Sequence, residues 1–254
     1  MADLELAVST VILALLPGSC PTAVSAAAPA DGPAEPAGPA DALRLHLPLV
    51  RRTREPFAER WALPGGWVTP DERLSEAARR TLEETTGLRP SYLEQLYTFG
   101  APRRSPTGRV VSVVYTALVR APEAADVEVG ENVRWAPADA LAETVGDLAF
   151  DHAEIVDYAL WRLRTKVSYA AIAQHLLGEL FTLAELRHVH EAVLGKPLDP
   201  ANFRRTAVAS GSVEATEHVQ TGAAHRPARL YRAVLPPGGA TGGYPPWQSR
   251  PELG

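Results

Sequence analysis

The chain has 254 residues, of which 46% are hydrophobic and 22% charged, and its formal net charge is -5. This is the composition of a globular protein with a core of its own, and the charge excludes a surface that is basic throughout. The single cysteine, Cys20, excludes an internal disulfide and a multi-cysteine zinc site, and it favours a reducing, cytoplasmic setting. The apolar run Leu6–Leu16 is too short for a membrane-spanning helix, and it follows Asp3 and Glu5 rather than the basic residues of an export signal.

The apolar pattern of residues 1–150 predicts a mixed α/β domain. The β-rich run Val8–Leu16 and the alternating leucines of Leu43–Val50 predict two strands, with an Ala- and Pro-rich segment, residues 17–41, between them. That segment lacks the apolar residues of a core and is expected to be a disordered loop. A Gly-rich turn then precedes a predicted helix over residues 74–85. The further predicted elements are strands at Leu93–Phe99, Val110–Val119 and Val127–Trp135, and a short helix at Pro137–Leu141.

The remainder of the chain predicts linking helices over residues 151–180, a winged helix-turn-helix domain over residues 181–234 and a disordered tail over residues 235–254. Thr182 begins a capping box, and Asp199 followed by proline is a second helix start. The predicted elements are a helix over residues 151–164, helical structure over residues 169–194, a helix from Pro200 to near Gly211, and strands at Val213–Val219 and Arg229–Val234. Two helices followed by a hairpin are the layout of a winged helix.

Residues 66–88 resemble the Nudix box, whose family pattern is G-x5-E-x7-R-E-U-x-E-E-x-G-U, where U is aliphatic. The residues in register with this pattern are Gly66, Glu72, Arg80, Leu82, Glu84, Gly87 and Leu88. Thr81 and Thr85 stand where the family has glutamates. Nudix enzymes cleave a diphosphate linked to another group, and divalent metals, usually Mg²⁺, neutralise the phosphates and activate water.

The two threonines bear directly on this metal chemistry. Positions 81, 84 and 85 share one helix face, and a hard cation prefers the carboxylates that the family places there. Only Glu84 remains as a candidate metal ligand, so hydrolysis is expected to be weak or absent, with Mg²⁺ required only if activity survives. An active protein would use Glu84, Glu72 and Arg80. In the alternative interpretations, Glu72 caps a helix together with Thr69, Arg80 binds Glu84 or Glu72, and Glu84 is a solvated helix residue.

Several stretches beyond the box point to one family. They are Phe150-Asp151-His152-Ala153-Glu154-Ile155, Phe181-Thr182-Leu183 with Glu185-Leu186-Arg187, Asn202-Phe203-Arg204-Arg205, and Arg226-Pro227-Ala228-Arg229-Leu230-Tyr231-Arg232. Together with the altered box they resemble the Nudix-related transcriptional regulators of NAD metabolism, the NrtR family. The resemblance covers nearly the whole chain except residues 17–41 and the tail.

The resemblance implies a Nudix-like α/β/α sandwich domain followed by a winged helix-turn-helix domain. It implies a homodimeric repressor that binds a palindromic double-stranded DNA operator near genes of NAD synthesis or salvage. The Nudix domain would sense ADP-ribose or a related NAD metabolite. The alternative function is a Mg²⁺-dependent Nudix hydrolase that acts on ADP-ribose or another nucleoside diphosphate, with the C-terminal domain assisting dimerisation.

The helix from Pro200 is the expected DNA-recognition helix, because Phe203 and Ala207 share its inward face while Arg205 lies roughly opposite. The candidate DNA-binding residues are Asn202, Arg204, Arg205, Arg226, Arg229 and Arg232. Residues 181–232 hold seven basic and five acidic residues, so positive charge is concentrated in this region. The alternative for this region is a protein-interaction domain with solvated arginines.

The candidate effector-binding residues are Arg51, Arg52, Gly65, Gly66, Arg104 and Arg109. Arginines near a diphosphate pocket suit ADP-ribose, because a guanidinium binds phosphate oxygens in pairs. The glycines shape the loop before the box helix. In the alternative interpretation the arginines only make the surface loops soluble.

Overall fold

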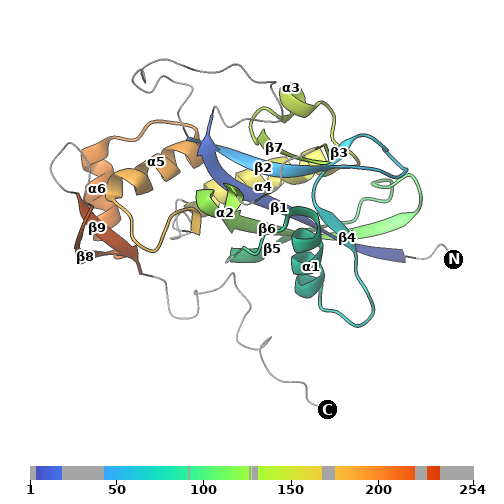
Figure 1. Cartoon of the computed structure of the whole chain (residues 1–254), viewed down its shortest axis with the longest axis horizontal. Coiled ribbons are helices and arrows are strands. Elements are labelled where there is room, and N and C mark those ends of the chain that lie inside the picture. The colour runs from blue at the N-terminus through green and yellow to red at the C-terminus, as the bar shows by residue number, and fades with distance from the viewer. Residues whose placement is uncertain are drawn as a thin grey trace, which may run out of the picture.

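The computed structural model describes residues 4–18, 43–90, 92–125, 127, 131–167, 175–220 and 228–234 (Figure 1). Most of the segment expected to be a disordered loop, the whole of the expected tail, and Arg226 lie outside these residues. Within the described part of the chain, no helix is both long and apolar enough to cross a membrane.

A seven-stranded mixed sheet forms the centre of the N-terminal domain. Its strands are β1 (Leu4–Pro17), β2 (Leu43–Arg51), β3 (Trp61–Ala62), β4 (Gly65–Trp67), β5 (Tyr92–Phe99), β6 (Arg109–Val119) and β7 (Val133–Pro137). The long strand β1 lies parallel to β6 and antiparallel to β2 and β4, while β5 forms one edge. The strands predicted at Val8–Leu16, Leu43–Val50, Leu93–Phe99 and Val110–Val119 are confirmed.

Helices cover both faces of this sheet (Figure 1). On one face, Ile12 of β1 packs in the same cluster as Ala78 and Leu82 of α1 (Leu74–Thr86), beside the short helix α2 (Ala121–Ala125). On the other face, Leu13 belongs to a cluster with Ile155 of α4 (His152–Val167). Because neighbouring strand residues point to opposite faces, burial on both sides explains the continuous apolar run of β1. The expected α/β/α arrangement is therefore present.

The C-terminal elements form the predicted winged helix. They are α5 (Leu183–Leu194), α6 (Pro200–Ala209) and an antiparallel pair of strands, β8 (Val213–Val219) and β9 (Arg229–Ala233). The capping box is confirmed, since the Glu185 N–H donates to Thr182 Oγ1 at 3.1 Å and the Thr182 N–H donates to Glu185 Oε2 at 2.7 Å. Asp199 likewise accepts from the Asn202 N–H at 2.7 Å and caps α6.

Three sequence predictions are wrong in detail. The short helix is α3 (Leu141–Val145) rather than Pro137–Leu141, because Pro137 pairs with β2 as the end of β7. The strand expected from residue 127 begins at Val133, and residues 128–130 lie outside the described residues. The helical run expected over residues 169–194 is interrupted before α5, where Phe181 exchanges two backbone hydrogen bonds with Tyr231 of β9. Burial of Phe181, which is 1% exposed, outweighs local helix propensity there.

The winged helix shares its core with the sheet. Leu186, Val189 and Val193 of α5 lie in the same apolar cluster as Leu47 of β2 and Ile155 of α4. Figure 1 shows α5, α6 and the wing, which consists of β8 and β9, at one end of the molecule, beyond the sheet. A shift of α4 therefore bears on the position of α5 directly, since closely packed cores transmit strain.

Candidate functional site

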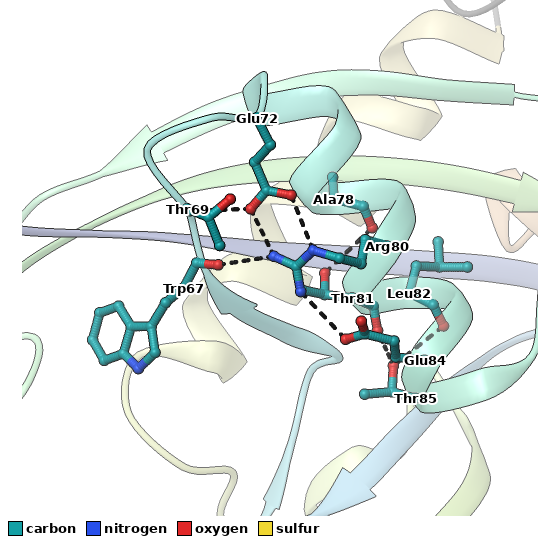
Figure 2. A network of polar contacts seen from close by, with 9 residues as sticks. All are labelled: Trp67, Thr69, Glu72, Ala78, Arg80, Thr81, Leu82, Glu84 and Thr85. Carbon is teal, nitrogen blue, oxygen red and sulfur yellow. Dashed lines mark hydrogen bonds and ion pairs between the residues drawn. The ribbon is translucent and has the colours of Figure 1, made fainter.

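The box residues form a network centred on Arg80 of α1 (Figure 2). Its guanidinium donates to both carboxylate oxygens of Glu72, at 2.7 and 3.0 Å, and to Glu84 at 3.3 Å. A further hydrogen bond runs to the Trp67 carbonyl at 3.1 Å. The charge-assisted bonds from Arg80 lower the pKa of Glu72 to about 2, so that carboxylate is ionised at neutral pH. Arg80 thus binds both glutamates that the sequence offered as alternatives.

Glu72 does not cap the box helix. Its carboxylate accepts from the Thr69 N–H at 2.8 Å, which closes the turn before the helix. The helix itself starts at Leu74, where Glu76 accepts from the Arg73 N–H at 2.9 Å. The cap expected from Thr69 and Glu72 is therefore wrong, because Glu72 turns towards Arg80 from the preceding loop.

The two threonines direct their hydroxyl groups into the helix. Thr81 is 3% exposed and donates to the Ala78 carbonyl at 3.3 Å. Thr85 donates to the carbonyls of Thr81 and Leu82, at 2.5 and 3.2 Å. Such bonds are the usual local alternative for a helical Ser or Thr hydroxyl.

The donor set of this face does not fit a divalent cation. Glu84 is the one carboxylate among positions 81, 84 and 85, and both Glu84 and Glu72 are bound by the positive charge of Arg80. Within the described residues, no group of three or more His, Cys, Asp or Glu side chains is placed to hold a metal ion. A hard cation would have to compete with Arg80 and would find only one carboxylate, Glu84, among positions 81, 84 and 85.

The glycine loop before the helix approaches other backbone closely. Gly65 and Gly66 belong to β4 and pair with Ser9 and Val8 of β1. A Cβ atom on Gly65 would lie 2.4 Å from the Val8 carbonyl oxygen, and one on Gly66 would lie 2.8 Å from the methyl carbon of Thr81. Close approach, rather than an unusual backbone angle, therefore requires glycine at both positions.

Each of the four candidate effector arginines has a partner within the protein. Arg51 forms an ion pair with Glu59. Arg52 donates to the Pro56 carbonyl at 2.8 Å, and its guanidinium lies 4.7 Å from the centre of the Phe150 ring. Arg109 donates to the Gly100 carbonyl at 2.7 Å.

Arg104 is bound most completely. Its guanidinium donates to both carboxylate oxygens of Asp151, at 2.7 and 2.9 Å, and its side chain is only 5% exposed. Arg104 therefore faces the start of α4, which sequence analysis did not anticipate. Arg104 and Asp151 are distant in sequence, so no local pattern predicts their pairing. The only indication was that Asp151 lies in residues 150–155, one of the stretches that resemble the family.

His152 is a second residue that sequence analysis did not single out as functional. It is buried at the start of α4, and its Nδ1 accepts from the Leu63 N–H at 2.9 Å. Burial lowers the pKa of His152 to about 4, although the neighbouring Asp151 opposes the shift. The ring is therefore neutral at physiological pH, as an accepting Nδ1 requires.

Helix α6, the expected recognition helix, presents its polar residues outwards. Asn202, Arg204 and Arg205 are exposed, and Arg205 donates to Asn202 Oδ1 at 2.6 Å. Phe203 and Ala207 pack against the core, as their spacing predicted. In the wing, Arg229 and Arg232 are exposed, and Arg232 binds Glu214 at 2.8 Å.

Comparison with known proteins agrees with this two-part architecture. A Nudix domain model matches residues 43–159, and a model of the NrtR DNA-binding winged helix domain matches residues 173–233. The ADPR responsive transcriptional repressor NtrR of Acinetobacter baylyi is 37% identical over 195 residues, 76% of this chain and 77% of that protein. An ADP-ribose pyrophosphatase of Methanocaldococcus jannaschii is 36% identical over 115 residues, 45% of this chain and 66% of the relative.

Among solved structures, Shewanella oneidensis NrtR is similar over nearly its full length. In complex with a 27mer DNA it has a TM-score of 0.70 and 32% identity, covering 90% of this chain and 93% of that one. The structure without DNA has a TM-score of 0.72, with the same identity. The fold and the two matched regions define a Nudix domain joined to a DNA-binding type of winged helix. The chain belongs to the NrtR family.

Proposed function

We propose that this protein is a transcriptional repressor whose DNA binding responds to ADP-ribose or a related NAD metabolite. The observation that carries the proposal is its identity of 37%, over three quarters of both chains, to a repressor named as ADPR responsive. The chain keeps both parts that such a protein needs, a Nudix domain and an exposed basic recognition helix.

DNA binding would rest on α6 and the wing. Arg204 and Arg205 are exposed on α6, and arginine in the major groove binds guanine edges or phosphate. Asn202 lies next to Arg205 and would contact a base or phosphate. Arg229 and Arg232 of β9, with Arg226 outside the described residues, would hold the backbone. We propose a homodimer on a palindromic operator, so that two recognition helices read two half-sites.

The effector would bind the Nudix domain beside the glycine loop. Gly65 and Gly66 shape this loop. Arg51 ends β2, Arg52 follows it and Arg109 begins β6, and these arginines would supply positive charge for a diphosphate. Arg104 was expected among these contacts, but its guanidinium is bound by Asp151. The role of Arg104 is therefore proposed to be indirect.

A Mg²⁺-dependent hydrolase is the second candidate, and the similarity of the Nudix domain to an ADP-ribose pyrophosphatase favours it. The box argues against it. Thr81 and Thr85 replace two carboxylates and leave Glu84 as the one carboxylate among positions 81, 84 and 85. We propose that the box is catalytically degenerate and that the domain still binds the effector although it no longer hydrolyses it.

The test is fluorescence anisotropy of the full chain on DNA from upstream of its own gene and of neighbouring genes for NAD synthesis or salvage. Specific, salt-sensitive binding that ADP-ribose releases is the expected result. Anisotropy is then followed over time with Mg²⁺ present, because recovery would reveal hydrolysis of the effector. Absence of specific binding on every fragment would overturn the repressor proposal and make nucleotide turnover the first function to assay.

A further inference from the structure

Two adjacent residues at the start of α4 each bind a different loop of the Nudix domain. Asp151 accepts two hydrogen bonds from Arg104, which lies in the loop between β5 and β6. His152 accepts the Leu63 N–H, which lies in the turn between β3 and β4. Both contacts are largely removed from solvent, since the side chains of Arg104 and Asp151 are 5% and 15% exposed and His152 is buried.

The preceding residue, Phe150, contacts a third loop, the one between β2 and β3. Phe150 has a φ of 55°, in the left-handed region that residues other than glycine rarely adopt. Its ring packs edge-on against Phe57 with the centroids 4.9 Å apart, and the Arg52 guanidinium lies 4.7 Å from its centre. Three loops of the Nudix domain therefore meet at residues 150–152.

These loops carry the residues proposed to face the effector. Leu63 is followed directly by Pro64 and the two glycines, and the Pro64 carbonyl accepts from the Thr10 N–H at 2.8 Å in the centre of the sheet. Arg104 shares its loop with Gly100, to which Arg109 is bonded. Movement of either loop on binding a ligand would strain the contact to α4.

The other end of α4 meets the winged helix. The helix has 16 residues and is therefore about 24 Å long. Near its end, Arg164 Nε donates to the Val193 carbonyl of α5 at 3.2 Å. Leu160 and Leu163 of α4 lie in the same apolar cluster as Val193. The helix thus has polar contacts to the effector loops at one end and to the DNA-binding domain at the other.

We propose that Arg104, Asp151 and His152 are positioning residues that couple the effector site to the winged helix through α4, without touching either ligand. The proposal rests on the proposed function and assigns the regulation of that site. In this mechanism the bound effector displaces the loops that contain Leu63 and Arg104. Their hydrogen bonds to Asp151 and His152 shift the start of α4. Because the helix is rigid, the same displacement reaches α5. Coupling of this kind is a change in one ligand's affinity caused by the other.

The test measures coupling separately from affinity in the full-length protein. Asp151→Asn keeps the shape of the side chain but removes the charge that holds Arg104. For this variant and the wild type, the dissociation constant for operator DNA is measured with and without saturating ADP-ribose, and the ratio is the coupling factor. We expect the DNA affinity without effector to stay within about threefold and the coupling factor to fall roughly tenfold or more. The ADP-ribose affinity of the free protein, measured by calorimetry, is expected to change by less than about threefold.

The matched control is Asp139→Asn, which breaks the exposed ion pair of Asp139 with Arg44, 2.7 Å long, neither partner of which belongs to α4. We expect a coupling factor equal to that of the wild type. An unchanged factor in Asp151→Asn would overturn the proposal. A large loss of ADP-ribose affinity with the coupling factor intact would also overturn it, because Arg104 would then serve the effector pocket directly. If ADP-ribose has no effect on DNA binding by the wild type, the proposed function itself fails.

A second variant and a second measurement cover the case in which Asp151→Asn fails to fold. His152→Phe fills the same space but removes the acceptor of the Leu63 N–H, and a tenfold loss of coupling is expected again. Hydrogen exchange on the wild type, with and without ADP-ribose, should show changed protection at the Leu63 amide, along α4 and in α5. Changes confined to the loops, with α4 unaffected, would overturn the proposal without any substitution.

Discussion

At the scale of single residues, Arg80 is the centre of the polar contacts within the box. It binds Glu72 and Glu84 at once, while Thr81 and Thr85 turn their hydroxyl groups to the carbonyls of their own helix. One positive charge is thus shared by two carboxylates, and the two threonines add no charge to the helix face on which the Nudix box places three glutamates. The threonines were visible in the sequence, but the arrangement around Arg80 needed the structure, since Glu72 lies in a turn whose direction no periodicity specifies.

Restoring the carboxylates tests this interpretation. In Thr81→Glu with Thr85→Glu, three carboxylates would share the helix face, and we expect Mg²⁺-dependent hydrolysis of ADP-ribose to rise roughly tenfold or more above the wild type. The measurement is AMP release with Mg²⁺ and with a chelator. Thr81→Gln with Thr85→Gln is the control, because it adds the same bulk without charge. A wild type as active as the glutamate variant would contradict the degenerate box.

The exposed arginines of α6 lead to a second prediction for single residues. Arg205→Ala removes an exposed guanidinium of α6, and one base or phosphate contact of this kind contributes about 1–3 kcal/mol to binding. We therefore expect operator affinity to fall about tenfold or more, with ADP-ribose affinity unaltered. Anisotropy and calorimetry measure the two quantities. The control is Arg89→Ala, an 81% exposed arginine after the box helix. Equal DNA binding by both variants would show that α6 is not the recognition helix.

At the scale of elements, the local rules predicted most boundaries. Thr182, Gly195 and Asp199 act at helix ends as their residue types dictate. The predicted boundaries are wrong where a residue distant in sequence determines the local structure. Phe181 leaves the helical pattern to pair with Tyr231, and Pro137 continues a strand because β2 lies beside it. Such pairings join residues far apart in sequence, so periodicity in a short window does not report them.

The short strand β4 carries a stability prediction. In Gly65→Ala the new methyl group would meet the Val8 carbonyl at 2.4 Å, and backbone inside a paired sheet does not yield easily. We expect the free energy of unfolding to fall by about 3 kcal/mol. Gly66→Ala meets only the Thr81 methyl, at 2.8 Å, and should cost about 1–2 kcal/mol.

Urea unfolding measures the losses of stability in Gly65→Ala and Gly66→Ala, and two further variants test their cause. Thr81→Ser removes the opposing methyl carbon, so it should recover most of the loss in Gly66→Ala but none in Gly65→Ala. Gly108→Ala is the control, since its Cβ would have only the Glu5 carboxylate near it, at 3.9 Å. Equal effects at Gly65 and Gly66 would contradict the close approach of β4 to β1.

At the scale of the whole molecule, the two domains are joined by a common core and by α4. Leu47, Ile155 and Val193 belong to one cluster that crosses from the sheet through α4 to α5. His152 is buried at the start of α4, the helix that the two domains share, and is neutral in the folded protein. Because the ring gains a proton more readily in the unfolded chain, its titration links pH to the stability of the fold.

The pH dependence has a definite sign. The pKa of His152 is about 4 in the folded protein and 6.5 in the unfolded chain, so between these values the unfolded chain binds more protons. The contribution of the neutral ring is complete above pH 6.5 and is lost as pH falls towards 4. At pH 5 we expect the contribution of His152 to the free energy of unfolding to have fallen by about 2 kcal/mol.

Chemical denaturation at pH 7 and pH 5 measures this loss in the wild type and in His152→Gln. The variant lacks the titrating ring, so its stability should fall less over the same interval. His218→Gln, at an exposed position of the wing, is the control and should follow the wild type. An identical pH dependence in all three proteins would show that His152 does not titrate with folding.

The amino-acid sequence by itself determined the order of domains, the box register with its two threonines, the helix caps and the outward arginines of α6. These features depend on residue type and on spacing within a few turns of chain, which local physics governs. Only the tertiary structure decided that Arg80 binds both box glutamates, that Arg104 binds Asp151, and that His152 is buried against Leu63. Arg104 and His152 are held by residues distant in sequence, and Glu72 reaches Arg80 from the turn before α1, so spacing along the chain does not specify these contacts. The buried groups need such partners, because a charge or hydrogen-bonding group that is removed from water is costly when it is left unpaired.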